Sequence, residues 1–172
     1  MTLGELEYES ENLSEARLHF SRAAMMWKDD LPDPSSVEAK AYLGLLDALQ
    51  NRPRGRAEIE SSMAQAARMR QVGLDAQCRI FLGRAFLRER RYDDALRTLN
   101  GIKAGGPESV GPELLAQALY WRGQGLAAKR DTTAAADADR QARKLLDDLR
   151  ATLPEQYRDG FAKRLTIRLI GG

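Results

Sequence analysis

Four glycines recur at a nearly constant spacing and constrain the fold of this 172-residue chain more than any other feature. They are Gly4, Gly44, Gly83 and Gly123, which lie 40, 39 and 40 residues apart. Each lies among small and apolar residues whose three- and four-residue spacing is typical of an α-helix. Because two helices approach closely only where side chains are small, this recurrence predicts a repeated pair of packed helices.

The unit around Gly83 shows the pattern most clearly. Arg91 and Tyr92 interrupt the apolar period, which predicts a tight turn between two helices. The second helix resumes the period at 12, 16 and 19 residues after the glycine, and a proline closes the unit; these residues are Ala95, Leu99, Ile102 and Pro107. We expect Ala95 to lie against Gly83.

The other three units match these offsets unevenly. The unit of Gly4 has Ala16, Phe20 and Ala23, and the unit of Gly123 has Ala135, Asp139 and Ala142. Asp139 is poorly suited to a buried position. The unit of Gly44 matches if one residue is inserted near Pro53, which gives Ala57, Ser61 and Ala64.

The pattern resembles the tetratricopeptide repeat, through Leu82-Gly83, Phe86, Ala95, Leu99 and Pro107, through Gly4, Ala16, Phe20 and Ala23, and through Trp121-Arg122-Gly123. The period of about 40 exceeds the usual 34 residues, and longer periods occur in relatives within bacterial signalling and transcriptional regulators. The resemblance implies an all-α, right-handed superhelix of helical hairpins. The four hairpins would span residues 1–34, 35–73, 74–110 and 111–151.

Capping residues, glycine and proline place the boundaries of the helices. Asn12 with Glu15, and Ser35 with Glu38, predict capping boxes. Residues 29–36 are expected to form a loop, Pro53 and Gly55 a turn, and Gly73 a break, while Pro112 suits a first helical turn. A face carrying Ala16, Phe20, Ala23, Ala24 and Trp27 is expected on the second helix. The other helices are expected to end near Ser10 and Gln50 and to span residues 56–71, 113–129 and 132–150.

Residues 152–172 predict a single capping helix. Its stripe, with four-residue spacing, is Tyr157, Phe161, Leu165 and Leu169. Such a helix would cover the last apolar face of a repeat array, and its bases Arg158, Lys163, Arg164 and Arg168 would face solvent or a neighbour. The first hairpin has no equivalent cap, so we expect a fragment of a longer protein or a face covered by another chain.

Composition and charge indicate a soluble, cytoplasmic protein. No apolar run is long enough to span a membrane, the first residues do not form a secretory signal, and one cysteine, Cys78, fits a reducing compartment. Residues 1–40 hold nine acids and four bases, and the remainder holds sixteen acids and twenty-three bases. This asymmetry could attract an acidic partner or align chains end to end, or it could be solvated surface. Because bases and acids are interleaved, a nucleic-acid partner is not expected.

The sequence offers no constellation for catalysis, a cofactor or a metal. His19 is the one histidine and has no cluster of ligands around it in the sequence. Cys78 lacks a candidate base. Gly123-Gln124-Gly125 lacks the strand and the lysine of a phosphate loop. We therefore expect no enzyme activity.

The resemblance implies a concave groove lined by the first helix of each hairpin. Its candidate residues are Gln77, Ile80, Arg84, Leu87, Arg88, Gln117, Tyr120 and Gln124, with Glu38, Ala41, Leu45, Ala48 and Leu49 in the second hairpin. Arg84 and Arg88 could bind an acidic ligand, or they could be solvated or paired with Glu89, Asp93 or Asp94.

Two functions fit these expectations. The first is a non-catalytic scaffold that binds a protein or peptide segment in the groove. The alternative is an oligomerisation or sensor segment of a larger bacterial regulator, which would associate through its N-terminal hairpin, residues 1–28.

Overall fold

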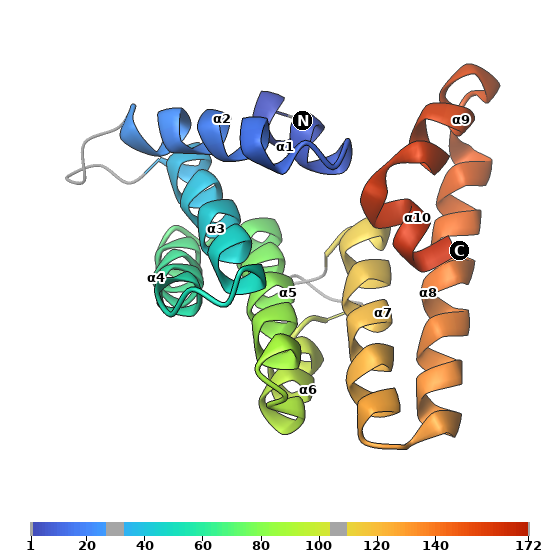
Figure 1. The fold of residues 1–172 in the computed structure, drawn as a ribbon. Coiled ribbons are helices and arrows are strands. Elements are labelled where there is room, and N and C mark those ends of the chain that lie inside the picture. Colours follow the sequence, from blue (N-terminus) through green and yellow to red (C-terminus); the bar gives the residue numbers. More distant parts are fainter. Residues whose placement is uncertain (1, 27–32, 104–109, 172) are drawn as a thin grey trace.

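The chain is all α-helical in the part that the computed structural model describes, residues 2–26, 33–103 and 110–171 (Figure 1). Ten helices account for this part: α1 (Leu3–Glu9), α2 (Leu13–Met25), α3 (Pro34–Leu49), α4 (Arg54–Arg68), α5 (Val72–Arg88), α6 (Tyr92–Asn100), α7 (Pro112–Ala128), α8 (Thr132–Thr152), α9 (Glu155–Lys163) and α10 (Leu165–Gly171). None of the described helices is both long and apolar enough to cross a lipid bilayer. Trp27, residues 29–32 of the expected loop, and Pro107 lie outside the described residues.

Successive helices pack against each other from α1 to α8, and a second set of contacts joins alternate helices (Figure 1). Helix α3 contacts α5, and α5 contacts α7. The chain then turns back, so that α10 packs on α7 and α8 and also reaches α1. The first and last helices of the described chain are therefore in contact.

The four anchor glycines each lie where the first helix of a pair meets the second. A Cβ atom added at Gly4 would lie 2.6 Å from the ring of Phe20, and one at Gly83 would lie 2.8 Å from Leu99. The close partner of Gly83 is thus Leu99 rather than Ala95. At Gly123 the nearest atom is farther away, the Ala135 carbonyl oxygen at 3.3 Å.

The predicted register of α4 was wrong. Ala57, Ser61 and Ala64 are exposed, whereas the buried face carries Gly55, Ile59, Ser62 and Ala66. A Cβ atom at Gly55 would lie 2.3 Å from the backbone nitrogen of Ala48. Gly55, inside α4, is therefore the small residue that faces Gly44 in this pair of helices. Its distance in sequence from Gly44 is one residue shorter than the corresponding distance in the other pairs, whereas the prediction made it one residue longer.

Several helix ends also differ from the sequence prediction. The Asn12 side chain donates a hydrogen bond to Glu7 at 2.9 Å and does not cap α2. Helix α3 starts at Pro34, because the Asp33 carboxylate accepts hydrogen bonds from the backbone N–H groups of Ser35 and Ser36. The predicted loop therefore ends at Asp33. Gly73 lies inside the first turn of α5, and the break before it is at Arg70.

The same left-handed turn ends the first helix of every pair. Glu11, Asn51, Arg90 and Arg130 have φ values of 63°, 57°, 60° and 67°, and each lies seven residues after an anchor glycine. At each turn the next N–H group bonds back to a carbonyl of the helix, as in Arg91 N to Phe86 O at 2.8 Å. This is the usual αL helix ending, made here without glycine.

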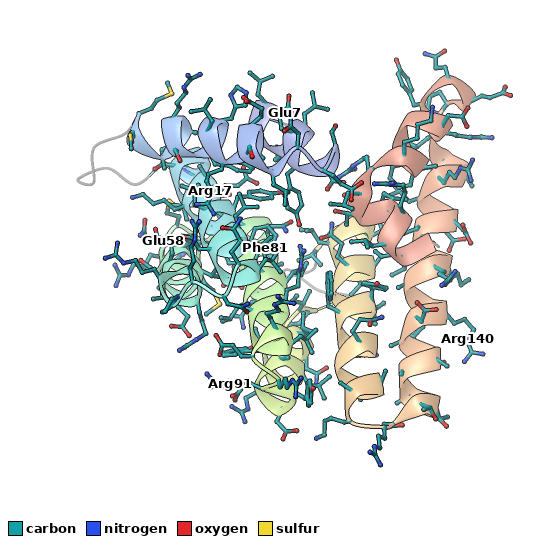
Figure 2. All side chains as sticks on the ribbon, in the orientation of Figure 1. Glu7, Arg17, Glu58, Phe81, Arg91 and Arg140 are labelled. Atoms are coloured by element: carbon teal, nitrogen blue, oxygen red, sulfur yellow. The ribbon has the colours of Figure 1, made fainter. Side chains whose placement is uncertain are left out.

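The interior consists of two clusters of buried side chains. The first cluster spans α1 to α7 and contains four aromatic rings in contact, with Tyr42 lying against Tyr8, Phe20 and Phe81. The second cluster joins α7, α8 and α10 through Ala116, Leu119, Ala142, Leu146, Ile167 and Ile170. Phe81, labelled in Figure 2, projects from α5 into the first cluster.

The predicted single C-terminal helix is two short helices, α9 and α10, separated by Arg164 with extended backbone. Consequently the expected stripe does not form one buried face: Tyr157 and Leu169 are exposed, and Ile167 and Ile170 are buried instead. The break lets α10 fold back toward the start of the chain.

A cluster of polar side chains holds α10 to α1 and α7. The buried Glu9 carboxylate accepts hydrogen bonds from Thr166 N at 3.0 Å and from the Thr166 hydroxyl at 2.6 Å. Arg164 donates two hydrogen bonds to Glu113 at 3.0 and 2.6 Å. Burial opposes the charge of Arg164, but its hydrogen bonds to Glu113 raise its pKa above the usual value. Two of the C-terminal bases, Arg164 and Arg168, therefore pair with acids of this same chain.

Candidate functional site

A surface hollow of about 350 Å³ lies where α3, α5, α6 and α7 come together. Its walls combine aliphatic, aromatic and cationic side chains: Leu49, Arg84, Leu87, Arg88, Tyr92, Trp121, Gln124 and Ala128. Five of the predicted groove residues, Leu49, Arg84, Leu87, Arg88 and Gln124, lie together here. We name this hollow the arginine pocket.

Arg84 is positioned by aromatic residues from two other helices. Its guanidinium carbon lies 4.7 Å from the ring centroid of Trp121, a cation–π contact, and its Nη1 donates a hydrogen bond to the Tyr8 hydroxyl at 2.7 Å. Its Nε atom is buried and has no hydrogen-bond partner among the described residues. These contacts hold the positive charge at the wall of the pocket without neutralising it.

Arg88 lies one turn further along α5 and is exposed. Its Nε donates to the Asn51 side-chain oxygen at 3.3 Å. Among the described residues, none of the ion pairs includes Arg84 or Arg88, and the three acids predicted to pair with them have other partners. Glu89 pairs with Arg56 and Arg91, Asp93 with Lys129, and Asp94 with Arg91 and Arg97. The predicted salt bridges to Arg84 and Arg88 are therefore absent from this part of the chain.

The remaining predicted groove residues lie elsewhere. Ile80 is 0% exposed and Gln117 is 8% exposed, so both are interior residues. Tyr120 is half-buried and packs edge-on against Trp121. The sequence pattern did not predict Tyr92 and Trp121 as pocket residues. It indicates Tyr92 only as an interruption of the apolar period and Trp121 only as part of a repeat motif.

Gln77 lines a separate hollow of about 290 Å³ together with Glu38, Leu74 and Leu114. Burial, followed by the negative charge of Glu5, raises the pKa of Glu38 from its usual 4.5 to about 7. Among the described residues, none of the ion pairs includes Glu38, so no paired base offsets the cost of burying its charge.

A third hollow, of about 620 Å³, lies between the end of α4 and the start of α5. Lys103 and Val110, on either side of residues 104–109, are among its lining residues. Its Arg79 already pairs with Asp75 at 2.6 Å. The arginine pocket is the better candidate, because Arg84 and Arg88 form no ion pair with the residues that the structure describes.

The single cysteine, Cys78, is buried in α5. Burial, followed by the charge of Asp75, raises the pKa of Cys78 to about 12, so the thiol stays protonated at neutral pH. Within the described ranges, no three His, Cys, Asp or Glu residues are close enough to hold a metal ion.

Comparison with protein-family models, with curated proteins and with solved structures gave no match.

Proposed function

We propose that this chain is a tetratricopeptide-like solenoid that acts as a non-catalytic scaffold, and that the arginine pocket binds an acidic segment of a partner protein. Two features of the fold support the solenoid: contacts from α3 to α5 and from α5 to α7, and left-handed turns at one offset from each anchor glycine. The cytoplasm is the compartment proposed for it.

The observation that carries the proposal is the pair of guanidinium groups, Arg84 and Arg88, that lack an ion-pair partner within the described chain. Arg84 is already ordered by Trp121 and Tyr8, so a carboxylate that binds it costs little conformational entropy of the side chain. A carboxylate accepts charge-assisted hydrogen bonds from a guanidinium. Leu49, Leu87 and Tyr92 beside it would contact an apolar neighbour of the acidic residue.

Fluorescence polarisation with labelled peptides tests the proposal. The probes are a library of peptides with a central Glu-Glu pair flanked by varied apolar residues, and the same library with Gln-Gln in its place. We expect selected Glu-Glu peptides to bind at least about tenfold more tightly than their Gln-Gln counterparts, since charged hydrogen bonds contribute about 1.5–3 kcal/mol each.

Matched variants assign the binding to the pocket. Arg88→Glu, alone and combined with Arg84→Gln, should abolish the preference for acidic peptides. The control variant, Arg54→Gln with Arg68→Gln, removes two exposed arginines of α4 and should bind normally. Equal binding of the two libraries, or full binding by the double pocket variant, would refute the proposal.

A further inference from the structure

The first helical pair exposes most of the large apolar side chains that lie on the surface of the described chain. Six of the nine belong to it: Leu3, Leu6, Leu13, Leu18, Met25 and Met26. Met25 is 83% exposed. Side chains of α1 and α2 project toward the top of the view in Figure 2, away from α3. A concentration of exposed apolar groups of this kind marks an interaction surface.

The outer face of α2 carries charges as well as apolar groups. Glu15, Leu18, Arg22 and Met25 follow one another at spacings of three, four and three, so they share one face of the helix. Glu15 and Arg22 lie on the surface, and neither is part of an ion pair or side-chain hydrogen bond of the described residues. The face therefore has one unpaired acid, one unpaired base and apolar residues between and beyond them.

The order of these charges fits a second copy of the same helix. Glu15 and Arg22 lie equally far, in opposite directions, from the midpoint beside Leu18. When two copies pack antiparallel about a two-fold axis at that midpoint, Glu15 of each copy faces Arg22 of the other. A two-fold interface needs such self-complementarity, because residue i contacts j and j contacts i. A parallel arrangement would instead place like charges together.

We propose that the chain forms a two-fold homodimer in which α2 packs antiparallel against α2 of a second copy. Leu18 and Met25 supply the apolar contacts, and two Glu15–Arg22 pairs fix the direction and register. Leu3 and Leu6, exposed on α1, lie on the same hairpin. The arginine pocket lies among α3, α5, α6 and α7, so this inference is independent of the proposed peptide binding.

The test is the mass of the whole chain in solution, measured by sedimentation velocity from about 1 µM to about 1 mM, a range that spans weak and moderate dimers. We expect a concentration-dependent dimer. Glu15→Arg would place two positive charges opposite each other at both ends of the interface, and Arg22→Glu would do the same with negative charges. Each variant alone should therefore dimerise about tenfold or more weakly. Mixing the two variants should restore dimerisation, because a heterodimer brings each mutant residue opposite a residue of the other sign.

The control, Glu58→Arg, reverses an exposed charge on α4 and should leave the dimer unchanged. Circular dichroism of each variant checks that α2 remains helical. A monomer at every concentration would overturn the proposal. So would a dimer that the single reversals do not weaken, or variants whose mixture associates no more strongly than either variant alone.

Discussion

The core that spans α1 to α7 and the core that joins α7, α8 and α10 are built from different side chains. In the first, the ring of Tyr42 stacks on Phe20 with centroids 4.4 Å apart and meets Phe81 edge-on at 4.8 Å. In the second, small residues such as Ala116 and Ala142 are fully buried. Large rings fill space between helices, whereas alanines let helices approach. The first core therefore includes a network of aromatic rings in contact with one another, whereas the buried residues of the second core are Ala, Leu and Ile.

Truncating one large side chain in each core should give the largest effects and tests this contrast directly. Tyr42→Ala removes a ring that contacts three others and should lower the free energy of unfolding by about 4 kcal/mol. Leu146→Ala in the second core should cost about 2–3 kcal/mol. Urea denaturation measures both. A larger loss for Leu146→Ala than for Tyr42→Ala would contradict the idea that a ring of the aromatic network contributes more stability than an aliphatic side chain of the second core.

Adding one methyl group to the glycines of each region tests how closely the helices approach. Gly55→Ala would place Cβ against the Ala48 backbone, which cannot move aside as a side chain can, and should destabilise by at least about 2 kcal/mol. Gly123→Ala has its nearest atom at 3.3 Å and gains helix propensity, so its net effect should stay within about 1 kcal/mol. The thermal midpoints of the two variants check this, and similar midpoints would contradict it.

Removing the buried Glu9 carboxylate, which joins the two regions, should lower the free energy of unfolding by less than truncating the ring of Tyr42 does. Glu9→Gln weakens the hydrogen bonds to Thr166 and leaves Arg164 with one acidic partner fewer, so we expect a loss of about 2 kcal/mol. Hydrogen exchange should accelerate in α10 and not in α5. The matched control is Glu11→Gln, whose pair with Arg168 is exposed and should contribute less than about 1 kcal/mol.

The smallest effect is a pH dependence located in the first region. Because the pKa of Glu38 is about 7 in the folded chain and 4.5 ordinarily, the folded state holds more protons between these values. Stability should therefore decrease as pH rises from 4.5 to 7, by about 1 kcal/mol after allowing for partial exposure. Glu38→Gln should remove this decrease in urea titrations at several pH values. An unchanged slope would assign the effect to other groups.

Local patterns predicted the all-α class and most helix positions, because apolar spacing and the helix start at Pro112 depend only on residues a few positions apart. They could not predict the left-handed turns at Glu11, Arg90 and Arg130, since these residue types do not favour positive φ. The register predicted for α4 is wrong because the sequence pattern places Gly55 in a turn, whereas Gly55 lies inside α4 in close contact with the Ala48 backbone.

The longer-range features were harder to predict. A four-residue spacing continues across Arg164, yet the chain bends there, because Glu9 and Glu113 hold α10 against other helices. Nothing near Thr166 in the sequence indicates a partner 157 residues away. For the candidate pocket, the offsets from the anchor glycines predicted Arg84 and Arg88 as groove residues. They could not predict that the acids expected to pair with these arginines form ion pairs with other bases.

The contact between Glu9 and Thr166 has a consequence for the order of folding. The other main helix contacts join helices no more than three places apart along the chain, and these form early because they enclose shorter loops. Closing a loop of 157 residues is entropically costly, so this contact should form after the hairpins have assembled. An interaction absent from the transition state affects the unfolding rate alone. The tie between the two ends would therefore act as a kinetic latch, which slows the opening of the finished molecule without hastening its formation.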